Sequence, residues 1–214
     1  MGKYKVIDGN EACTHISYMF TEIAGIYPIT PASPMSEYID KWSTEGRLNL
    51  FNNRVKLIEM QSEAGAIALV HGSLQTGSLA STYTASQGLL LMIPSMYKIA
   101  GEMLPCVINV ASRTVATHAL SIFGDHSDIY ASRSTGFCFL ASSSVEDTIY
   151  MTLASYLSTL KGKLPFVNFF DGFRTSHELN KVYVPDMSEI KGLVPFKTID
   201  NFRKESMISK KQIK

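Results

Sequence analysis

Short apolar runs alternate with segments of helical periodicity along most of this chain. In the first such segment, Ala12, Ile16 and Phe20 recur at the spacing of one helix face. This alternation is typical of βαβ units, in which a helix connects each strand to the next parallel strand. It predicts an α/β fold with a mainly parallel sheet and helices on both faces. Strands are expected at residues 24–27, 55–59, 79–84, 106–111, 137–141 and 164–170.

Serine residues mark the expected starts of several helices. A serine hydroxyl can cap a helix by accepting a hydrogen bond from a backbone N–H of the first turn. Pro34 fits the first helical position after Ser33, where a missing N–H costs nothing. Glu146, three residues after Ser143, fits a capping box. The predicted caps are Ser33, Ser62, Ser86 and Ser143.

The composition argues against several classes of partner. A formal net charge of +1 provides no electrostatic attraction for nucleic acid or for an anionic membrane. The strongest apolar run, residues 89–93, is far shorter than the ~18–20 residues of a membrane span, and Pro94 is expected to interrupt the buried helix that contains it. The first residues are not followed by the apolar stretch of a secretory signal, so a cytoplasmic protein is expected.

The cysteines predict neither disulfides nor a metal site. Cys13, Cys106 and Cys138 lie far apart, and an odd number without paired spacing argues against a disulfide framework, a zinc site or an iron–sulfur site. Cys106 and Cys138 lie in apolar runs and are expected to be buried thiols. We therefore expect a reducing compartment.

The domain organisation follows from length and charge. With 214 residues, of which 45% are hydrophobic, the chain can form one large domain with its own core. We assign residues 1–194 to this domain and residues 195–214 to a basic tail. The tail has six basic residues against two acidic ones, which predicts a solvated surface helix that frays toward its end.

A proline-rich loop follows the first expected strand of the sheet. Pro28 and Pro31 fix their own φ angles and keep the residues before them out of the helical region. Thr30 places a hydroxyl in this loop, at the carboxyl end of a strand, where open α/β sheets bind their ligands. The alternative is a stiff connection without chemistry.

Glu63 and Arg113 are two further candidates for the site. Glu63 lies at the first turn of a helix, where a carboxylate usually complements the helix dipole. Its neighbours are small or apolar, however, and a partly buried carboxyl group suits proton transfer because burial raises its pKa. Arg113 directly follows a strand. It is either a surface arginine or an arginine whose guanidinium group binds a carboxylate through two parallel hydrogen bonds.

The loop after Arg113 contains the run Asp125-His126-Ser127-Asp128. Its spacing matches no specific metal site, so we expect Asp125 or Ser127 to cap the next helix, and no metal ligands are assigned. The chain also has neither a Gly-x-Gly-x-x-Gly motif nor a Walker A loop. An α/β sheet without a phosphate loop binds either a small ligand or only part of a cofactor whose phosphates lie elsewhere.

Several motifs, taken together and in order, resemble the N-terminal, pyrimidine-binding domain of pyruvate:ferredoxin (flavodoxin) oxidoreductases. The resemblance extends from about residue 5 to residue 203. The motifs are Tyr27-Pro28-Ile29-Thr30-Pro31-Ala32-Ser33-Pro34-Met35, Gln61-Ser62-Glu63-Ala64-Gly65-Ala66, Ser86-Gln87-Gly88-Leu89-Leu90-Leu91-Met92-Ile93-Pro94, Ala111-Ser112-Arg113-Thr114 and Phe123-Gly124-Asp125-His126-Ser127-Asp128.

The resemblance implies a thiamine diphosphate enzyme. Members of that family decarboxylate pyruvate on this cofactor, pass electrons through iron–sulfur clusters to ferredoxin or flavodoxin, and form acetyl-CoA from CoA. Other domains of the full enzyme, which is expected to be a homodimer, hold the diphosphate, the magnesium ion and the clusters. This division would explain the missing phosphate loop.

The resemblance also implies roles for individual residues. Glu63 matches the glutamate that hydrogen-bonds N1′ of the aminopyrimidine ring, with Pro28 expected on the same cofactor-binding side. Arg113 matches the arginine that binds the substrate carboxylate. Thr30 matches the threonine that hydrogen-bonds the substrate near its reacting carbon.

The chain departs from the family in lacking the remaining domains and in its last residues, 206–214. We therefore expect a fragment of the enzyme, or one piece of a split enzyme, that is inactive by itself. The alternative is a non-catalytic remnant that acts as a binding or assembly module. Pyruvate is the expected substrate, although a close 2-oxoacid is left open.

Overall fold

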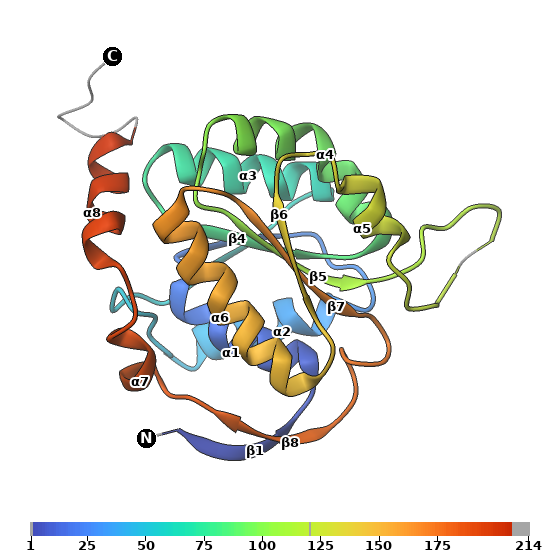
Figure 1. Cartoon of the computed structure of the whole chain (residues 1–214), viewed down its shortest axis with the longest axis horizontal. Helices are drawn as coiled ribbons and strands as arrows, with labels where there is room; N and C mark the ends of the chain where they lie inside the picture. The colour runs from blue at the N-terminus through green and yellow to red at the C-terminus, as the bar shows by residue number, and fades with distance from the viewer. Residues whose placement is uncertain (1, 120, 207–214) are drawn as a thin grey trace.

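The computed structural model describes residues 2–119 and 121–206, and it contains a parallel sheet of six strands in the order β3-β2-β4-β5-β7-β6 (Figure 1). Each strand lies within two residues of the apolar run that predicted it. The predicted α/β fold with a mainly parallel sheet is therefore confirmed. The strands of this sheet are β2 (Ile23–Ile26), β3 (Lys56–Glu59), β4 (Ala80–Thr84), β5 (Val107–Ser112), β6 (Cys138–Ser142) and β7 (Phe166–Asp171).

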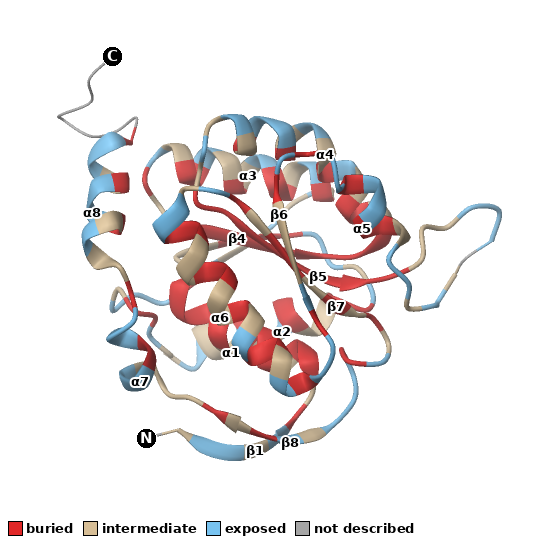
Figure 2. Cartoon of the chain, in the orientation of Figure 1, coloured by how far each residue is buried: buried red, intermediate tan, exposed pale blue. Residues whose placement is uncertain are grey.

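Helices cover both faces of the sheet, as predicted (Figure 1). One face carries α3, α4 and α5, and the other carries α1, α2 and α6, with α1 packed against both α2 and α6. The central strands β4 and β5 are buried along their whole length (Figure 2), because parallel strands between two helix layers have no solvent-facing side. The helices are α1 (Gly9–Phe20), α2 (Ser33–Thr44), α3 (Glu63–Gln75), α4 (Ser86–Gly101), α5 (Ser127–Ser132) and α6 (Val145–Gly162).

One of the four predicted caps is confirmed. The Ser62 hydroxyl accepts a hydrogen bond from the Gly65 amide at the start of α3. The prediction for Ser33 was wrong, because Ala32 occupies the cap position and the backbone amides of Ala32 and Ser33 both bond to the Ile29 carbonyl. The turn before α2 thus satisfies these donors without a side chain.

The prediction that Ser143 caps α6 was wrong by one residue. Ser144 is the N-cap of α6, and its hydroxyl accepts the Asp147 amide. The Asp147 carboxylate turns back to bond the amide and hydroxyl of Ser143.

Two predictions about α4 were also wrong. Ser86 is the first residue of the helix rather than its cap, and its amide bonds to a carboxylate from another element, Asp128. Pro94 does not interrupt α4, which continues to Gly101. A proline removes only one donor, and Pro94 lies on the exposed side while the opposite side packs against α3 and α5.

The cysteine prediction held in part. All three cysteines are free and Cys106 is buried, but Cys138 is only half-buried. Cys138 begins β6, which lies at the edge of the sheet and has a strand on one side only.

A two-stranded antiparallel ribbon was not predicted. It pairs β1 (Lys3–Ile7) with β8 (Asn180–Val184), so that the beginning of the chain lies beside residues near its end (Figure 1). Val182 and Val184 face the core, whereas Lys3 and Tyr4 are exposed. The apolar pattern of β1 is too weak to predict a strand without its partner.

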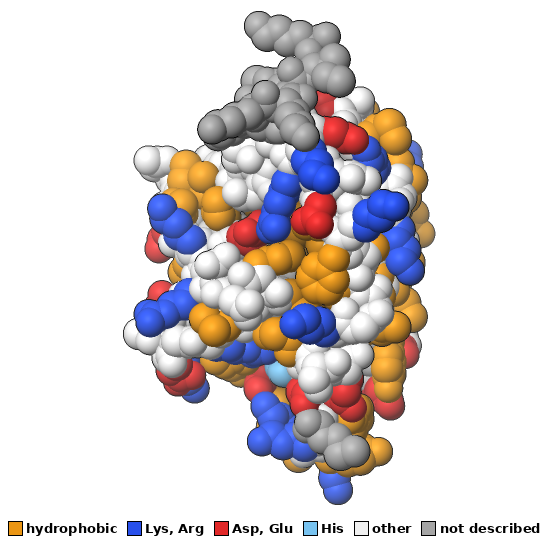
Figure 3. Space-filling model, turned by 90° about the vertical axis from the view of Figure 1, so that its left-hand side faces the viewer, with side chains coloured by type: hydrophobic (Ala, Val, Ile, Leu, Met, Phe, Trp, Pro, Cys, Tyr) orange, Lys and Arg blue, Asp and Glu red, His pale blue; other side chains and the backbone are white. Residues whose placement is uncertain are grey.

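The last described part of the chain forms α7 (Met187–Lys191) and α8 (Phe196–Glu205) along one side of the molecule. Figure 3 shows this side, where charged side chains of both signs surround hydrophobic ones. Ile199 and Phe202 of α8 are buried, and Arg203 forms an ion pair with Glu22 at 3.0 Å. The prediction that the tail, residues 195–214, frays toward its end concerns residues 207–214 as well, and these lie outside the described residues. None of the helices in the described residues has the length and hydrophobicity needed to span a membrane.

Candidate functional site

The candidate residues meet at the carboxyl edge of the parallel sheet. Strands β2, β4 and β5 are neighbours and run in the same direction, so the segments that follow them emerge side by side. The loop with Thr30 follows β2, α4 follows β4, and Arg113 follows β5. Open α/β sheets bind ligands at this edge.

Arg113 is buried, with 9% of its surface exposed, and it points toward the Thr30 loop. Its Nη1 donates to the Thr30 carbonyl oxygen at 2.6 Å, and its Nη2 donates to Gln87 Oε1 at 3.4 Å. Its Nε is buried and has no hydrogen-bond partner within the described part of the chain. No carboxylate of those residues forms an ion pair with Arg113 either. A guanidinium group in this state can still bind an anion.

Glu63 is the first residue of α3 and is 6% exposed. Its side chain lies against Gly88 of α4: a Cβ atom added to Gly88 would be 2.8 Å from both Cγ and Oε1 of Glu63 and 2.4 Å from Thr84 Oγ1. No described residue forms a hydrogen bond or ion pair with the Glu63 carboxylate, and the buried Thr84 hydroxyl has no partner among those residues either. Such an unpartnered pair of polar groups is costly unless something else bonds to it.

Gln87 and Gly88 connect the two sides of the site. Gln87 contacts the Arg113 guanidinium, and the next residue, Gly88, provides the space in which Glu63 lies. The structure thus brings Glu63, Thr30 and Arg113 to one edge. The sequence contains the motif Ser86-Gln87-Gly88, but its pattern predicts no role for Gln87, Gly88 or the neighbouring Thr84. The place of these three residues in the site is visible only once α3 is seen to lie close to α4.

The Thr30 loop is held from three sides. Asn10 of α1 donates to the Pro31 carbonyl at 3.0 Å, and Arg113 bonds to the Thr30 carbonyl. On the third side, the backbone of Gly172 packs closely against the loop. A Cβ atom added to Gly172 would lie 2.6 Å from Pro31 Cγ and 2.3 Å from the Ser112 carbonyl oxygen. The Thr30 side chain remains exposed and forms no hydrogen bond with the described residues.

Pro28 is exposed in the same loop. No hydrogen bond of the described residues involves it. Its assignment to the cofactor side therefore stays a prediction.

The run Asp125-His126-Ser127-Asp128 does not cap α5 in the way that the sequence predicts. Neither Asp125 nor Ser127 is the cap of α5, because that position belongs to His126; Asp125 Oδ1 accepts the Ser127 amide at 2.8 Å instead. Asp128 points inward and is completely buried, and burial raises the pKa of its carboxyl group, with hydrogen bonds from Ser112 and backbone amides opposing the rise. The described residues contain no cluster of histidine, cysteine and acidic side chains that could bind a metal ion.

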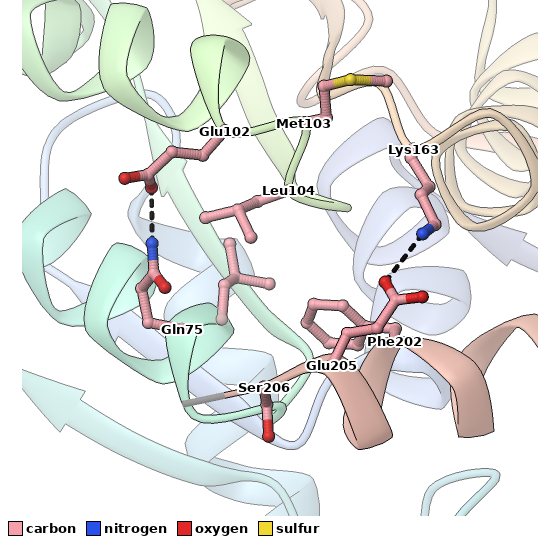
Figure 4. A pocket seen from close by; sticks show the side chains of 9 residues that line it. Gln75, Glu102, Met103, Leu104, Lys163, Phe202, Glu205 and Ser206 are labelled. Carbon is pink, nitrogen blue, oxygen red and sulfur yellow. Dashed lines mark hydrogen bonds and ion pairs between the residues drawn. The ribbon is translucent and has the colours of Figure 1, made fainter. Parts of the chain in front are cut away.

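A cavity lies elsewhere, at another part of the described chain. It has a volume of about 560 Å³, and Leu74, Leu104 and Phe202 form its apolar part (Figure 4). Lys163 and Glu205 form an ion pair across one side, with a 2.8 Å separation of Nζ and Oε2. Met103 and Leu104 precede β5 and Lys163 precedes β7, so this cavity is at the amino edge of the sheet, opposite the site.

Comparison with known proteins agrees with this geometry. Residues 16–214 match the family model described as pyruvate flavodoxin/ferredoxin oxidoreductase, thiamine diphosphate-binding. The chain is 54% identical to pyruvate:ferredoxin oxidoreductase of Moorella thermoacetica over 203 residues, which cover 95% of this chain and 17% of that protein. It is 53% identical to pyruvate-flavodoxin oxidoreductase of Klebsiella pneumoniae over 206 residues, or 96% of this chain and 18% of that protein.

A solved structure shares the fold. The 2-oxoglutarate:ferredoxin oxidoreductase of Magnetococcus marinus matches 87% of this chain and 32% of that chain, with a TM-score of 0.75 and 21% identity. The chain spans less than a fifth of the length of the two curated relatives above. Within that length, the match covers both sides of the carboxyl-edge site. The chain therefore belongs to the pyruvate flavodoxin/ferredoxin oxidoreductase family and corresponds to its N-terminal, thiamine diphosphate-binding region.

Proposed function

We propose that this chain provides the pyrimidine side and the substrate side of the active site of a pyruvate:ferredoxin or pyruvate:flavodoxin oxidoreductase. The observation that carries the proposal is that two buried, charged groups lie at one sheet edge and form no ion pair with any described residue: the Glu63 carboxylate and the Arg113 guanidinium. The family match supports the enzyme domain rather than the alternative of an assembly module.

Glu63 is the residue that would hold the aminopyrimidine ring. Its carboxylate and the Thr84 hydroxyl lie around the space at Gly88, and both lack protein partners among the described residues, as expected for groups that bond to a ligand. The carboxylate would accept a hydrogen bond from a protonated ring nitrogen and would favour the protonated form of that nitrogen. The chemistry that thiamine diphosphate supplies when bound is an electron sink for decarboxylation.

Arg113 would bind the carboxylate of pyruvate. Its buried Nε and its Nη atoms offer parallel donors, and charge-assisted bonds of this kind are short and geometrically specific. The bond from Nη1 to the Thr30 carbonyl keeps the guanidinium next to the loop that carries the Thr30 hydroxyl. Thr30 then places a hydroxyl near the carbon next to the carboxylate. Together the two residues orient the substrate.

The rest of the reaction belongs to other parts of the enzyme. We assign the diphosphate, the magnesium ion and the iron–sulfur clusters to domains outside this chain, since it has no phosphate loop and no cluster ligands in its sequence. CoA, ferredoxin or flavodoxin, and a homodimeric, cytoplasmic assembly are part of the same proposal. A close 2-oxoacid in place of pyruvate would use the same two residues for its carboxylate.

A domain exchange tests the proposal. Residues 5–203 of this chain replace the matching region of the Moorella thermoacetica relative, and pyruvate-dependent reduction of a viologen dye is measured with thiamine diphosphate, magnesium and CoA. We expect activity in the exchanged enzyme and none in the isolated chain. A folded, dimer-competent exchanged enzyme without activity contradicts the proposal and favours the assembly module. Dye reduction by the isolated chain contradicts the division between domains.

A further inference from the structure

Asp128 has no part in the chemistry above, yet it is among the most highly bonded side chains of the carboxyl edge. It is the second residue of α5, and none of its surface is exposed. Each carboxylate oxygen accepts two hydrogen bonds. Oδ1 accepts from the Ser112 hydroxyl at 2.7 Å and the Ile129 amide at 2.8 Å, and Oδ2 accepts from the Ser86 amide at 2.8 Å and the Arg113 amide at 3.1 Å.

These four donors belong to three different segments. Ser86 begins α4, Ser112 and Arg113 end β5 and start the following loop, and Ile129 is in α5. Ser86 and Arg113 are the decisive pair, because they share the same oxygen. That oxygen fixes the start of α4 relative to the end of β5.

The start of α4 needs such a bond. Ser86 has a φ of +48°, in the left-handed region that residues other than glycine rarely adopt. A strained backbone persists only where its surroundings hold it. The bonds from the Ser86 amide to Asp128 and from the Ser86 hydroxyl to the Thr114 carbonyl, at 2.8 Å each, hold this residue. Gln87 and Gly88 follow directly, so their positions depend on it.

We propose that Asp128 is a positioning residue that holds the Glu63 side and the Arg113 side of the active site at a fixed separation. It acts on Arg113 through the Arg113 backbone amide, and on Glu63 through Ser86 and Gly88. The consequence for catalysis rests on the function proposed above, whereas the consequence for the backbone does not.

An isosteric substitution separates this role from simple packing. In Asp128→Asn the side-chain volume is kept, but the new NH₂ group must face donors in either orientation. It meets the Ser86 and Arg113 amides in one orientation and the Ile129 amide in the other, where the Ser112 hydroxyl can turn toward the Asp125 carbonyl and accept from the NH₂ group. An unpaired buried donor is costly, so the segments are expected to move apart.

The first measurement is amide hydrogen exchange by NMR on the 214-residue chain. In Asp128→Asn, exchange at Ser86 and Arg113 is expected to accelerate about 10- to 100-fold, the effect of losing one bond to a charged group. Exchange at Ile108 and Val167, which pair with each other near the amino ends of β5 and β7, is expected to stay unchanged. The matched control is Asp147→Asn, which removes an aspartate that bonds a backbone amide near the start of α6. It should leave Ser86 and Arg113 unaffected. Unchanged exchange at both residues in Asp128→Asn overturns the proposal.

If Asp128→Asn fails to fold, Ser112→Ala provides the same test in milder form. It removes one donor to Oδ1 and leaves the three backbone amides in place. Exchange at Arg113 should then accelerate roughly 2- to 10-fold. No acceleration at Arg113 in this variant also overturns the proposal.

The second measurement is made in the exchanged enzyme described above. Asp128→Asn should both raise KM for pyruvate and lower kcat, with a combined loss of about 10²-fold in kcat/KM, as expected for a misplacement near 1 Å. A purely structural role lowers the amount of folded enzyme, hence the apparent kcat, and leaves KM unchanged; that result contradicts the proposal. If the wild-type exchanged enzyme is inactive, the proposed function fails, and hydrogen exchange still decides the role of Asp128.

Discussion

At the scale of single residues, Arg113 is a buried cation whose Nε has no partner in the described structure. In the exchanged enzyme, Arg113→Ala is expected to raise KM for pyruvate about 10- to 100-fold, because charge-assisted hydrogen bonds worth about 1.5–3 kcal/mol are lost. The matched control is Arg133→Ala at the exposed end of α5, where the guanidinium bonds only the Tyr130 carbonyl among the described residues. Steady-state kinetics should show no change in KM for the control. An unchanged KM in Arg113→Ala would mean that another group binds the carboxylate.

Glu63 allows a test of charge against shape. Glu63→Gln keeps the volume and a hydrogen-bonding group but loses the carboxylate, so kcat should fall at least about 10²-fold, as for other proton-transfer groups. The thermal midpoint should stay near that of the wild type. Glu146→Gln is the control, since Glu146 is exposed in the first turn of α6, where a carboxylate complements the helix dipole.

A different result is expected if Glu63 is only a helix-dipole residue. Glu63→Gln would then cost about 0.3–1 kcal/mol of stability and leave kcat unchanged. Thermal unfolding and steady-state kinetics on the same preparations distinguish the two roles.

His15 makes the stability of the chain depend on pH. Its Nε2 donates to the Pro185 carbonyl at 2.8 Å, so the neutral ring leaves Nδ1 to accept from Arg47 Nη2 at 3.2 Å. Burial and the Arg47 charge lower the pKa of His15 to about 4. The unfolded chain therefore binds this proton more readily, and stability is complete above the ordinary histidine pKa near 6.5 and declines as pH falls toward 4.

The expected loss between pH 7 and pH 5 is about 2 kcal/mol from this group. Urea unfolding at the two pH values should show this loss in the wild type beyond that in His15→Gln, which keeps a neutral donor and acceptor. Other groups that titrate in this range contribute equally to both proteins and cancel in the difference. Equal pH dependence of the two proteins would show that His15 is not held neutral.

At the scale of elements, the distance between α3 and the sheet depends on Gly25 of β2. A Cβ atom added there would be 2.8 Å from the Ala66 carbonyl and 3.2 Å from Leu69 Cδ2. Gly25→Ala must push α3, and Glu63 with it, away from β2. We expect a loss of about 1–3 kcal/mol in the free energy of unfolding, the usual cost of overpacking.

Gly72, in α3 itself, is the matched control. A Cβ atom added there meets no atom within 4 Å, and Gly72 is exposed. Gly72→Ala should therefore stabilise the chain by about 0.5–1 kcal/mol, because alanine is the better helix former. Urea unfolding should show that Gly25→Ala lowers the free energy of unfolding and Gly72→Ala raises it. Destabilisation of similar size in both variants would mean that the close contact of Gly25 with α3 is not the cause.

At the scale of the whole molecule, α8 decides where the folded unit ends. Phe202 is 9% exposed, and Arg203 lies over the Phe51 ring and pairs with Glu22. If α8 belongs to the core, Phe202→Ala should lower the free energy of unfolding by about 3–5 kcal/mol. If residues 195–214 are a solvated tail, as the sequence predicts, the change should stay within about 0.5 kcal/mol.

Leu193, just before α8, is the control for this experiment. It is 54% exposed, so Leu193→Ala should change stability little. Chemical denaturation of both variants gives the comparison directly. A small effect in Phe202→Ala would place the end of the domain before α8.

The parallel sheet and the α3 cap at Ser62 could be predicted because they depend on nearby residues. Apolar periodicity specifies which segments become strands and helices, and a serine cap bonds an amide only three residues away. The sheet edge that carries Thr30 and Arg113 followed from the same pattern, since carboxyl ends of parallel strands share one edge. The roles of these two residues and of Glu63 came from a resemblance, not from spacing.

The tertiary structure alone decided the features that join segments far apart in the chain. Ser86 was expected to cap α4 through its side chain, but its amide bonds to a residue 42 positions later. The need for glycine at position 88 appears only when α3 lies against α4, and the partner of β1 lies at the other end of the chain. Such contacts depend on the order of strands in the sheet and on the spacing of the helices above it. A sequence pattern reports the local preference of each segment, whereas these bonds exist only after the segments have packed together.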